Sequence, residues 1–127
     1  MSVRPLREGT QELPKPQGHA IGFADNQQAC DAIDDALTTQ GIDESKIILL
    51  AGNTGVEQLM QMMKGSWGEA EQAFLNNGIA ELHAGHFVIC VEADDFEEAK
   101  QIASIASHHG GRSFTHFGTF VDTSLPT

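Results

Sequence analysis

The chain has 127 residues, a length that suits one domain and not two independently cored ones. Asp and Glu number 18 against 7 Lys and Arg, so the net charge is -11 with histidine neutral. Because an acidic surface repels phosphate groups, this balance argues against nucleic acid and anionic membranes as partners. The first residues contain no apolar signal region, and no run of about 18 apolar residues is present to span a bilayer. We therefore expect a cytoplasmic protein.

The first 18 residues differ in composition from the rest of the chain. They contain three of the four prolines and little periodic apolar sequence, which favours an irregular arm over a packed element. Three basic residues against two acidic ones give this arm a net charge of +1, while the remainder carries 16 acids and 4 bases. We expect residues 1–18 to form an N-terminal arm, either lying across the acidic body or free in solvent, and residues 19–125 to form one domain.

Hydrophobic periodicity divides this domain into strands and helices. Short, uniformly apolar runs predict buried strands, and apolar residues recurring about every three to four positions predict helices with one buried face. A long alternating run near the C-terminus predicts a further strand. In chain order we expect a strand at 19–24, a helix at 26–40, a strand at 46–51, a helical insertion at 53–85, a strand at 86–93, a helix at 94–109 and a strand at 112–125.

This order of elements is that of an α+β split βαβ sandwich, the ferredoxin-like fold, with a helical insertion between the second and third strands. Right-handed crossovers place the third strand between the first and second, and the fourth outside the first, in a four-stranded antiparallel sheet. Both long helices then cover one face. A simple parallel α/β sheet is the main alternative.

The expected topology sorts polar residues by the end of the sheet at which they lie. The first and second strands finish at the same end of the sheet. The third strand begins at that end, and the second long helix also finishes there. Neutral imidazoles with a carboxylate suit zinc, and protonated ones suit a small anion, so this end is a candidate ligand site. Alternatively, the histidines only stabilise helix ends. The candidate metal ligands are His83, His86, His108 and His109, with Asp25 and Asn53 nearby and His19 at the opposite end.

A glycine-rich turn follows the second strand at the same end. Backbone N–H groups ahead of a helix can hold a phosphate, although this turn lacks both the Walker and the dinucleotide-binding patterns. An ordinary turn that begins a helix is the simpler interpretation. The full set of candidate ligand-binding residues is Asp25, Gly52, Asn53, Thr54, Gly55 and His86.

The last expected strand is unusually long. Its residues, 112–125, would extend about 46 Å, well beyond neighbours of six to eight residues. An uncovered outer strand carrying Phe114, Phe117 and Phe120 would promote aggregation. We therefore predict a homodimer that associates through this C-terminal strand, with the N-terminal arm as an alternative cover.

Three stretches, 47–59, 81–91 and 108–125, resemble a widespread bacterial family related to general stress protein 17M and heat-induced stress protein domains. The resemblance implies a small cytosolic, stress-associated protein with no assigned reaction. This chain departs from the family pattern at Phe117-Gly118-Thr119, where Tyr-Gly-Arg is expected. The matching positions are Leu50, Gly52 and Gly55, then Ala84, Gly85 and His86, then His109, Gly110, Gly111, Phe117 and Gly118.

The sequence thus favours a non-catalytic, homodimeric protein that binds a small ligand or a partner. The alternative is a cofactor-free enzyme of the dimeric α/β barrel type, with His86 or His116 as general base. A barrel enzyme needs a closed cavity between the sheet and a partner, whereas a ligand-binding protein needs an open cleft at the histidine end. A third possibility is a structural interaction protein in which the histidines have no chemical role.

Overall fold

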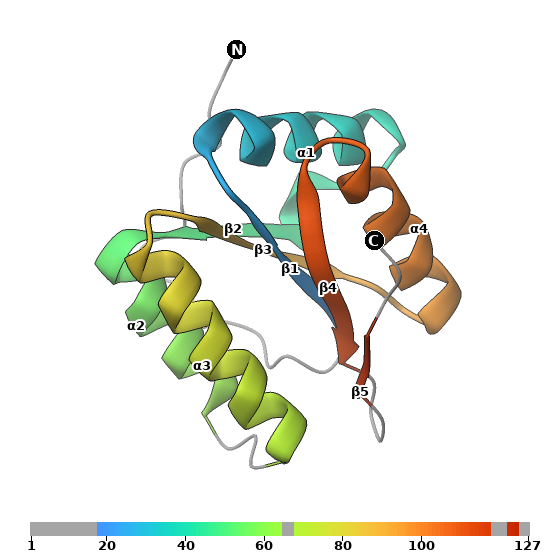
Figure 1. The fold of residues 1–127 in the computed structure, drawn as a ribbon. Helices are drawn as coiled ribbons and strands as arrows, with labels where there is room; N and C mark the ends of the chain where they lie inside the picture. Colours follow the sequence, from blue (N-terminus) through green and yellow to red (C-terminus); the bar gives the residue numbers. More distant parts are fainter. Residues whose placement is uncertain (1–17, 65–67, 118–121, 125–127) are drawn as a thin grey trace.

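The computed structural model describes residues 18–64, 68–117 and 122–124 (Figure 1). These residues contain five strands, four α-helices and one 3-10 turn. In chain order they are β1 (His19–Ala24), α1 (Gln27–Thr39), η1 (Glu44–Lys46), β2 (Ile47–Ala51), α2 (Gly52–Met63), α3 (Glu69–His83), β3 (Phe87–Glu92), α4 (Phe96–Ser107), β4 (Gly111–Phe117) and β5 (Asp122–Ser124). None of the described helices is both long and apolar enough to cross a bilayer.

The strands form one antiparallel sheet in the order β2-β3-β1-β4-β5. The expected placement of β3 between β2 and β1, and of β4 beside β1, is confirmed by the register of each pair. All pairings are antiparallel, so the alternative of a parallel α/β sheet is wrong. The described chain is therefore an α+β domain built on an antiparallel sheet.

The prediction of one continuous C-terminal strand is wrong. β4 ends at Phe117, and β5 returns antiparallel along it, with Phe117 paired to Asp122 and Thr115 to Ser124. A strand much longer than its neighbours would leave backbone donors and acceptors without partners, and the reversal supplies partners from the same chain. The dimer was predicted because a long outer strand would need a cover, and β4 is not such a strand. Self-association stays a prediction. Phe120 lies outside the described residues.

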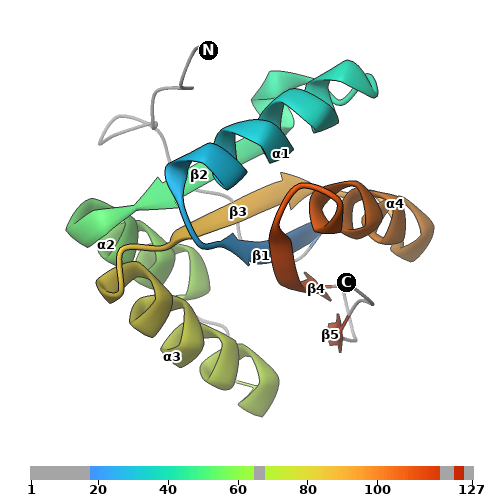
Figure 2. The same ribbon diagram turned by 45° about the horizontal axis from the view of Figure 1, so that its top comes forward.

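Helices cover both faces of the sheet, as Figure 2 shows. α1 and α4 pack on one face, as expected for the two long helices, and bury Ile33, Leu37 and Ile102 against it. Each begins at a side-chain cap: Asn26 accepts a hydrogen bond from the Ala29 amide, and Asp95 accepts one from the Glu98 amide. Each cap therefore sets the position at which the helix begins after the preceding strand.

The two helices between β2 and β3 pack on the opposite face. Leu59, Met62, Phe74 and Leu82 bury their side chains there, and α2 and α3 approach closely at Gly78, where a methyl group would overlap Leu59. The second face of β2 and β3 is therefore covered by the chain itself.

Close packing at β1 gives a first prediction. Phe114 lies over Gly22, so a methyl group in Gly22→Ala would overlap the phenyl ring. We expect this variant to lose about 1–3 kcal/mol of unfolding free energy in urea denaturation, because an overfilled core forces side chains from their preferred rotamers. The double variant Gly22→Ala/Phe114→Leu should lose less than the sum of the two single changes. Strict additivity would contradict the close contact.

Candidate functional site

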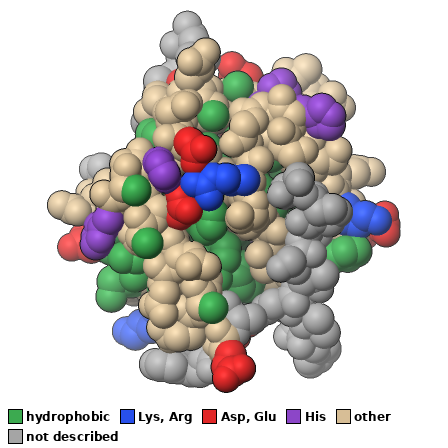
Figure 3. Space-filling view, in the orientation of Figure 1, with side chains coloured by type: hydrophobic (Ala, Val, Ile, Leu, Met, Phe, Trp, Pro, Cys, Tyr) green, Lys and Arg blue, Asp and Glu red, His purple; other side chains and the backbone are tan. Residues whose placement is uncertain are grey.

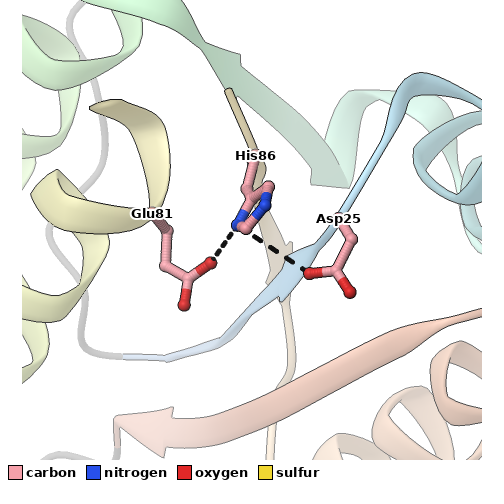
Figure 4. Close-up of side chains that lie close together, drawn as sticks. All are labelled: Asp25, Glu81 and His86. Carbon is pink, nitrogen blue, oxygen red and sulfur yellow. Dashed lines mark hydrogen bonds and ion pairs between the residues drawn. The ribbon is translucent and has the colours of Figure 1, made fainter. Parts of the chain in front are cut away.

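Four polar side chains from separate parts of the chain meet at one end of the sheet. Asp25 follows β1, Glu81 lies in the last turn of α3, His86 precedes β3 and Arg112 is the second residue of β4. Figure 4 shows His86 between the two carboxylates. We call these four residues the Arg112 cluster.

Arg112 joins the two carboxylates. Its Nε and Nη2 donate to Asp25 Oδ1 at 2.8 and 2.5 Å, and its Nη1 and Nη2 donate to Glu81 Oε2 and Oε1 at 3.0 and 2.5 Å. The guanidinium carbon lies 5.8 Å from the centre of the Phe23 ring, a cation–π distance. Four of the five N–H donors of the arginine are therefore directed at carboxylate oxygens.

His86 is oriented by Glu81. Its Nδ1 lies 2.6 Å from Glu81 Oε1, while its backbone N–H donates to the Glu81 carbonyl at 2.9 Å. Arg112 Nη2, itself a donor, lies 3.3 Å from the same Nδ1. A carboxylate at 2.6 Å requires a proton on Nδ1, so the 3.3 Å approach is a contact between two donors. Nε2 then carries the free lone pair of the neutral ring and has no partner among the described residues.

The paired charges shift the ionisation of the cluster. The hydrogen bond from Arg112 has the largest effect and, with a smaller contribution from His86, lowers the pKa of Glu81 from 4.5 to about 2 although burial acts in the opposite direction. The hydrogen bond to Glu81, followed by the one to Asp25, raises the pKa of Arg112 further above its already high value. Both groups therefore stay charged throughout the physiological range.

A β-bulge brings Arg112 to this cluster. Phe23 pairs with Arg112 but Ile21 pairs with Thr115, so one extra residue lies on β4, at Ser113, whose φ is 58°. In an uninterrupted strand Arg112 would share the face of Phe114, towards α1 and α4, because side chains alternate. The bulge turns Arg112 to the α3 face instead.

The bulge gives a second prediction. A β-branched residue tolerates a positive φ poorly, so Ser113→Val should lose about 1–2 kcal/mol of unfolding free energy. Ser113→Gly should stay within about 1 kcal/mol of the natural chain. Thr115→Val, in the same strand without a positive φ, is the matched control and should change little. Equal stability of the two valine variants in urea would show that Ser113 is not strained.

The ionisation of Glu81 gives a third prediction. Because its folded pKa is depressed to about 2, its contribution to stability is complete above the unfolded value of 4.5 and is lost as pH falls towards 2. The difference in unfolding free energy between the natural chain and Glu81→Gln should therefore shrink across this interval. The exposed Glu57→Gln is the control and should show no such change. A difference that is independent of pH would contradict the ion pair.

A cavity of about 460 Å³ lies beside the cluster, between α3 and β4. Figure 3 shows a basic side chain flanked by acidic ones on this face, with hydrophobic side chains directly below. Phe23 and Phe74 stack within the lining, with their ring centres 5.3 Å apart and nearly parallel. The lining residues are Phe23, Phe74, Asn77, Glu81, Ser113, Phe114 and Thr115.

The histidines expected to meet share an end of the sheet but not a face. His83 ends α3 on one face, whereas His108 and His109 follow α4 on the other and line a groove of about 670 Å³ against α1. His108 Nδ1 instead lies 2.7 Å from the Ser104 carbonyl oxygen. In the described part of the chain, the one group of three or more residues at metal-ligand spacing is Asp25, Glu81 and His86. His19, paired with Phe117 and Glu92, lies at the opposite end as expected.

These three groups suit a divalent cation in their chemistry, but Arg112 lies among them. Its Nη2 is 2.5 Å from one oxygen of each carboxylate and 3.3 Å from the imidazole. A metal ion bound to the same three atoms would have to displace the guanidinium.

The glycine-rich turn has a packing role. Gly52 begins α2 with a φ of 62°, and Gly55 packs so closely that an added methyl would lie 3.1 Å from the Leu50 backbone and 3.3 Å from Leu82. Asn53 and Thr54 are exposed on the first turn. Of the candidate ligand-binding residues, the structure therefore brings only Asp25 and His86 together.

Sequence reasoning missed Glu81 and Arg112 as site residues. One available signal was the scarcity of cations: after the arm, only four basic residues remain, and Arg112 directly follows the Gly110-Gly111 pair that ends a helix. No comparable feature of the sequence indicated the bulge that directs Arg112 to the cluster.

Comparisons with known proteins return no match, whether to a protein-family model, a curated protein or a solved structure. The resemblance to stress-protein families stays a prediction from sequence motifs, and the function must be argued from the geometry of the site.

Proposed function

We propose that this chain is a non-catalytic protein of ferredoxin-like fold that binds a small organic ligand in the cavity beside the Arg112 cluster. The strand order β2-β3-β1-β4, with α1 and α4 on one face, supports the fold, and α2 and α3 form the helical insertion between the second and third strands. The insertion creates one wall of the cavity, because α3 supplies Phe74, Asn77 and Glu81.

The observation that carries this proposal is the combination of cavity and cluster. A volume of about 460 Å³ falls within the range of small-molecule sites, which combine an apolar floor with a few fixed polar groups. Here the buried rings of Phe23 and Phe74 supply a small apolar area, and the polar lining comes from Asn77, Glu81, Ser113 and Thr115. Glu81 is fixed by two partners, so it presents a defined charge to the cavity.

The dimeric α/β barrel is less well supported. Such a barrel needs one face of the sheet open to a partner, but α2 and α3 cover β2 and β3 on the face opposite α1 and α4. His116 is buried on the α4 side, with its ring 6.1 Å from that of Phe96. The specific observation that favours an enzyme is His86, whose Nδ1 is bound to Glu81 and whose Nε2 is left available for proton transfer.

Two other predictions from the sequence belong to this proposal, but they do not support the binding site. Self-association now rests on the edges of the sheet: β2 pairs with β3 alone, and the outer edge of β5 has no strand beside it among the described residues. A cytoplasmic location stays an expectation from the sequence, and a stress-associated role rests on the motif resemblance.

A fragment screen by ligand-observed NMR tests the proposed site. We expect some small aromatic fragments to bind and to shift the amide signals of Phe74, Asn77 and Thr115. Thr115→Trp should fill the cavity and weaken these fragments by about tenfold or more. Ser104→Trp, in the groove between α1 and α4, is the matched control and should leave binding unchanged.

Fragments that shift only residues outside the cavity, or that bind Thr115→Trp as well as the natural chain, would contradict the proposal. Amide spectra of both tryptophan variants establish that each is folded. Turnover of a bound fragment that is abolished in His86→Ala would favour the enzyme instead.

A further inference from the structure

We infer that the ligand of this cavity is a small cation that donates hydrogen bonds, such as an amidinium or a protonated amine. The inference rests on the proposed binding function and specifies the charge of the ligand. It follows from two features of the site: the charge that lines the cavity and the hydrogen bonds already formed in the cluster.

The only charged side chain that lines the cavity in the described structure is a carboxylate, Glu81. The three lysines in the described residues, Lys46, Lys64 and Lys100, are absent from the lining. Arg112 carries one positive charge against the two carboxylates of Asp25 and Glu81, so these three side chains have a net charge of -1. The local electrostatic field therefore favours a positive ligand and disfavours an anion.

Arg112 has little capacity left to receive an anion. Four of its five N–H donors already bind Asp25 and Glu81, so a carboxylate or phosphate that takes two hydrogen bonds would have to displace one of these carboxylates. Acceptors, by contrast, are in excess. Glu81 Oε1 already accepts from Arg112 and His86, but Oε2 accepts from Arg112 alone and keeps a lone pair, and His86 Nε2 has no described partner. A ligand that donates hydrogen bonds matches this excess.

The aromatic side chains of the lining leave no open ring face for the ligand. Phe23 and Phe74 lie nearly parallel, at an interplanar angle of 16°, and both rings are buried. The guanidinium of Arg112 already lies 5.8 Å from the centre of the Phe23 ring. We therefore expect recognition to depend on charge, through a charge-assisted hydrogen bond from the ligand to Glu81 Oε2.

Three probes of one shape separate charge from fit: benzamidine, which is cationic, benzamide, which is neutral, and benzoate, which is anionic. Titration of each into the full chain, followed by amide chemical shifts, gives three dissociation constants. We expect benzamidine to bind at least about tenfold more tightly than the other two, since a charge-assisted pair is about twice as strong as a neutral one.

Glu81→Gln should remove most of this preference and leave benzamide binding within about threefold of its value on the natural chain, because only the ionic contribution is lost. Asp35→Asn removes one negative charge on the α1 side of the sheet and is the matched control, for which the preference should persist. Amide spectra establish that both variants remain folded.

The outcomes distinguish a failure of the cationic ligand from a failure of the binding function itself. Benzoate or benzamide binding in the cavity as tightly as benzamidine would overturn the cationic ligand and leave the binding site itself intact. An equal loss of benzamidine affinity in Asp35→Asn would also overturn it, by assigning the preference to the overall negative charge. Absence of binding in the cavity by all three probes, together with a failed fragment screen, would overturn the binding function as well.

Discussion

The guanidinium of Arg112, shared between the carboxylates of Asp25 and Glu81, is the interaction on which the candidate site depends. It connects the end of β1, the last turn of α3 and the start of β4, three segments far apart in the chain. Asp25 is more than half exposed, and an exposed ion pair of this kind contributes at most about 1 kcal/mol to stability. We therefore interpret the cluster chiefly as a device that orients Glu81 and His86, and only secondarily as a source of stability.

This interaction exists because β4 is irregular. The extra residue at Ser113 puts Arg112 on the α3 face while Phe114, two positions later, remains on the α4 face against Gly22. Backbone strain at one non-glycine residue thus allows one short strand to complete the core on one side and the charged cluster on the other. The cavity lies beside the bulge, with Ser113 and Thr115 in its lining.

The sequence predicted the order of the strands and the end of the sheet at which the polar residues lie, because hydrophobic periodicity and crossover handedness determine both. It could not predict on which face of the sheet each polar residue lies. His86 meets Glu81 of α3, whereas His108 follows α4, and α3 and α4 pack on opposite faces. The bulge at Ser113 and the reversal after Phe117 depend on pairing between strands, which the alternating pattern of residues 112–125 does not reveal.

The protonation of His86 tests the cluster most directly, because the 2.6 Å contact with Glu81 requires a proton on Nδ1. Long-range ¹H–¹⁵N correlation spectra of the histidine side chains, recorded at a pH where the ring is neutral, identify which nitrogen carries the proton. The structure predicts the Nδ1–H form for His86, with an unprotonated Nε2, and a return to the usual mixture in Glu81→Gln. A neutral His86 with its proton on Nε2 would mean that Glu81 does not hold the ring, and the cluster as described here would not exist.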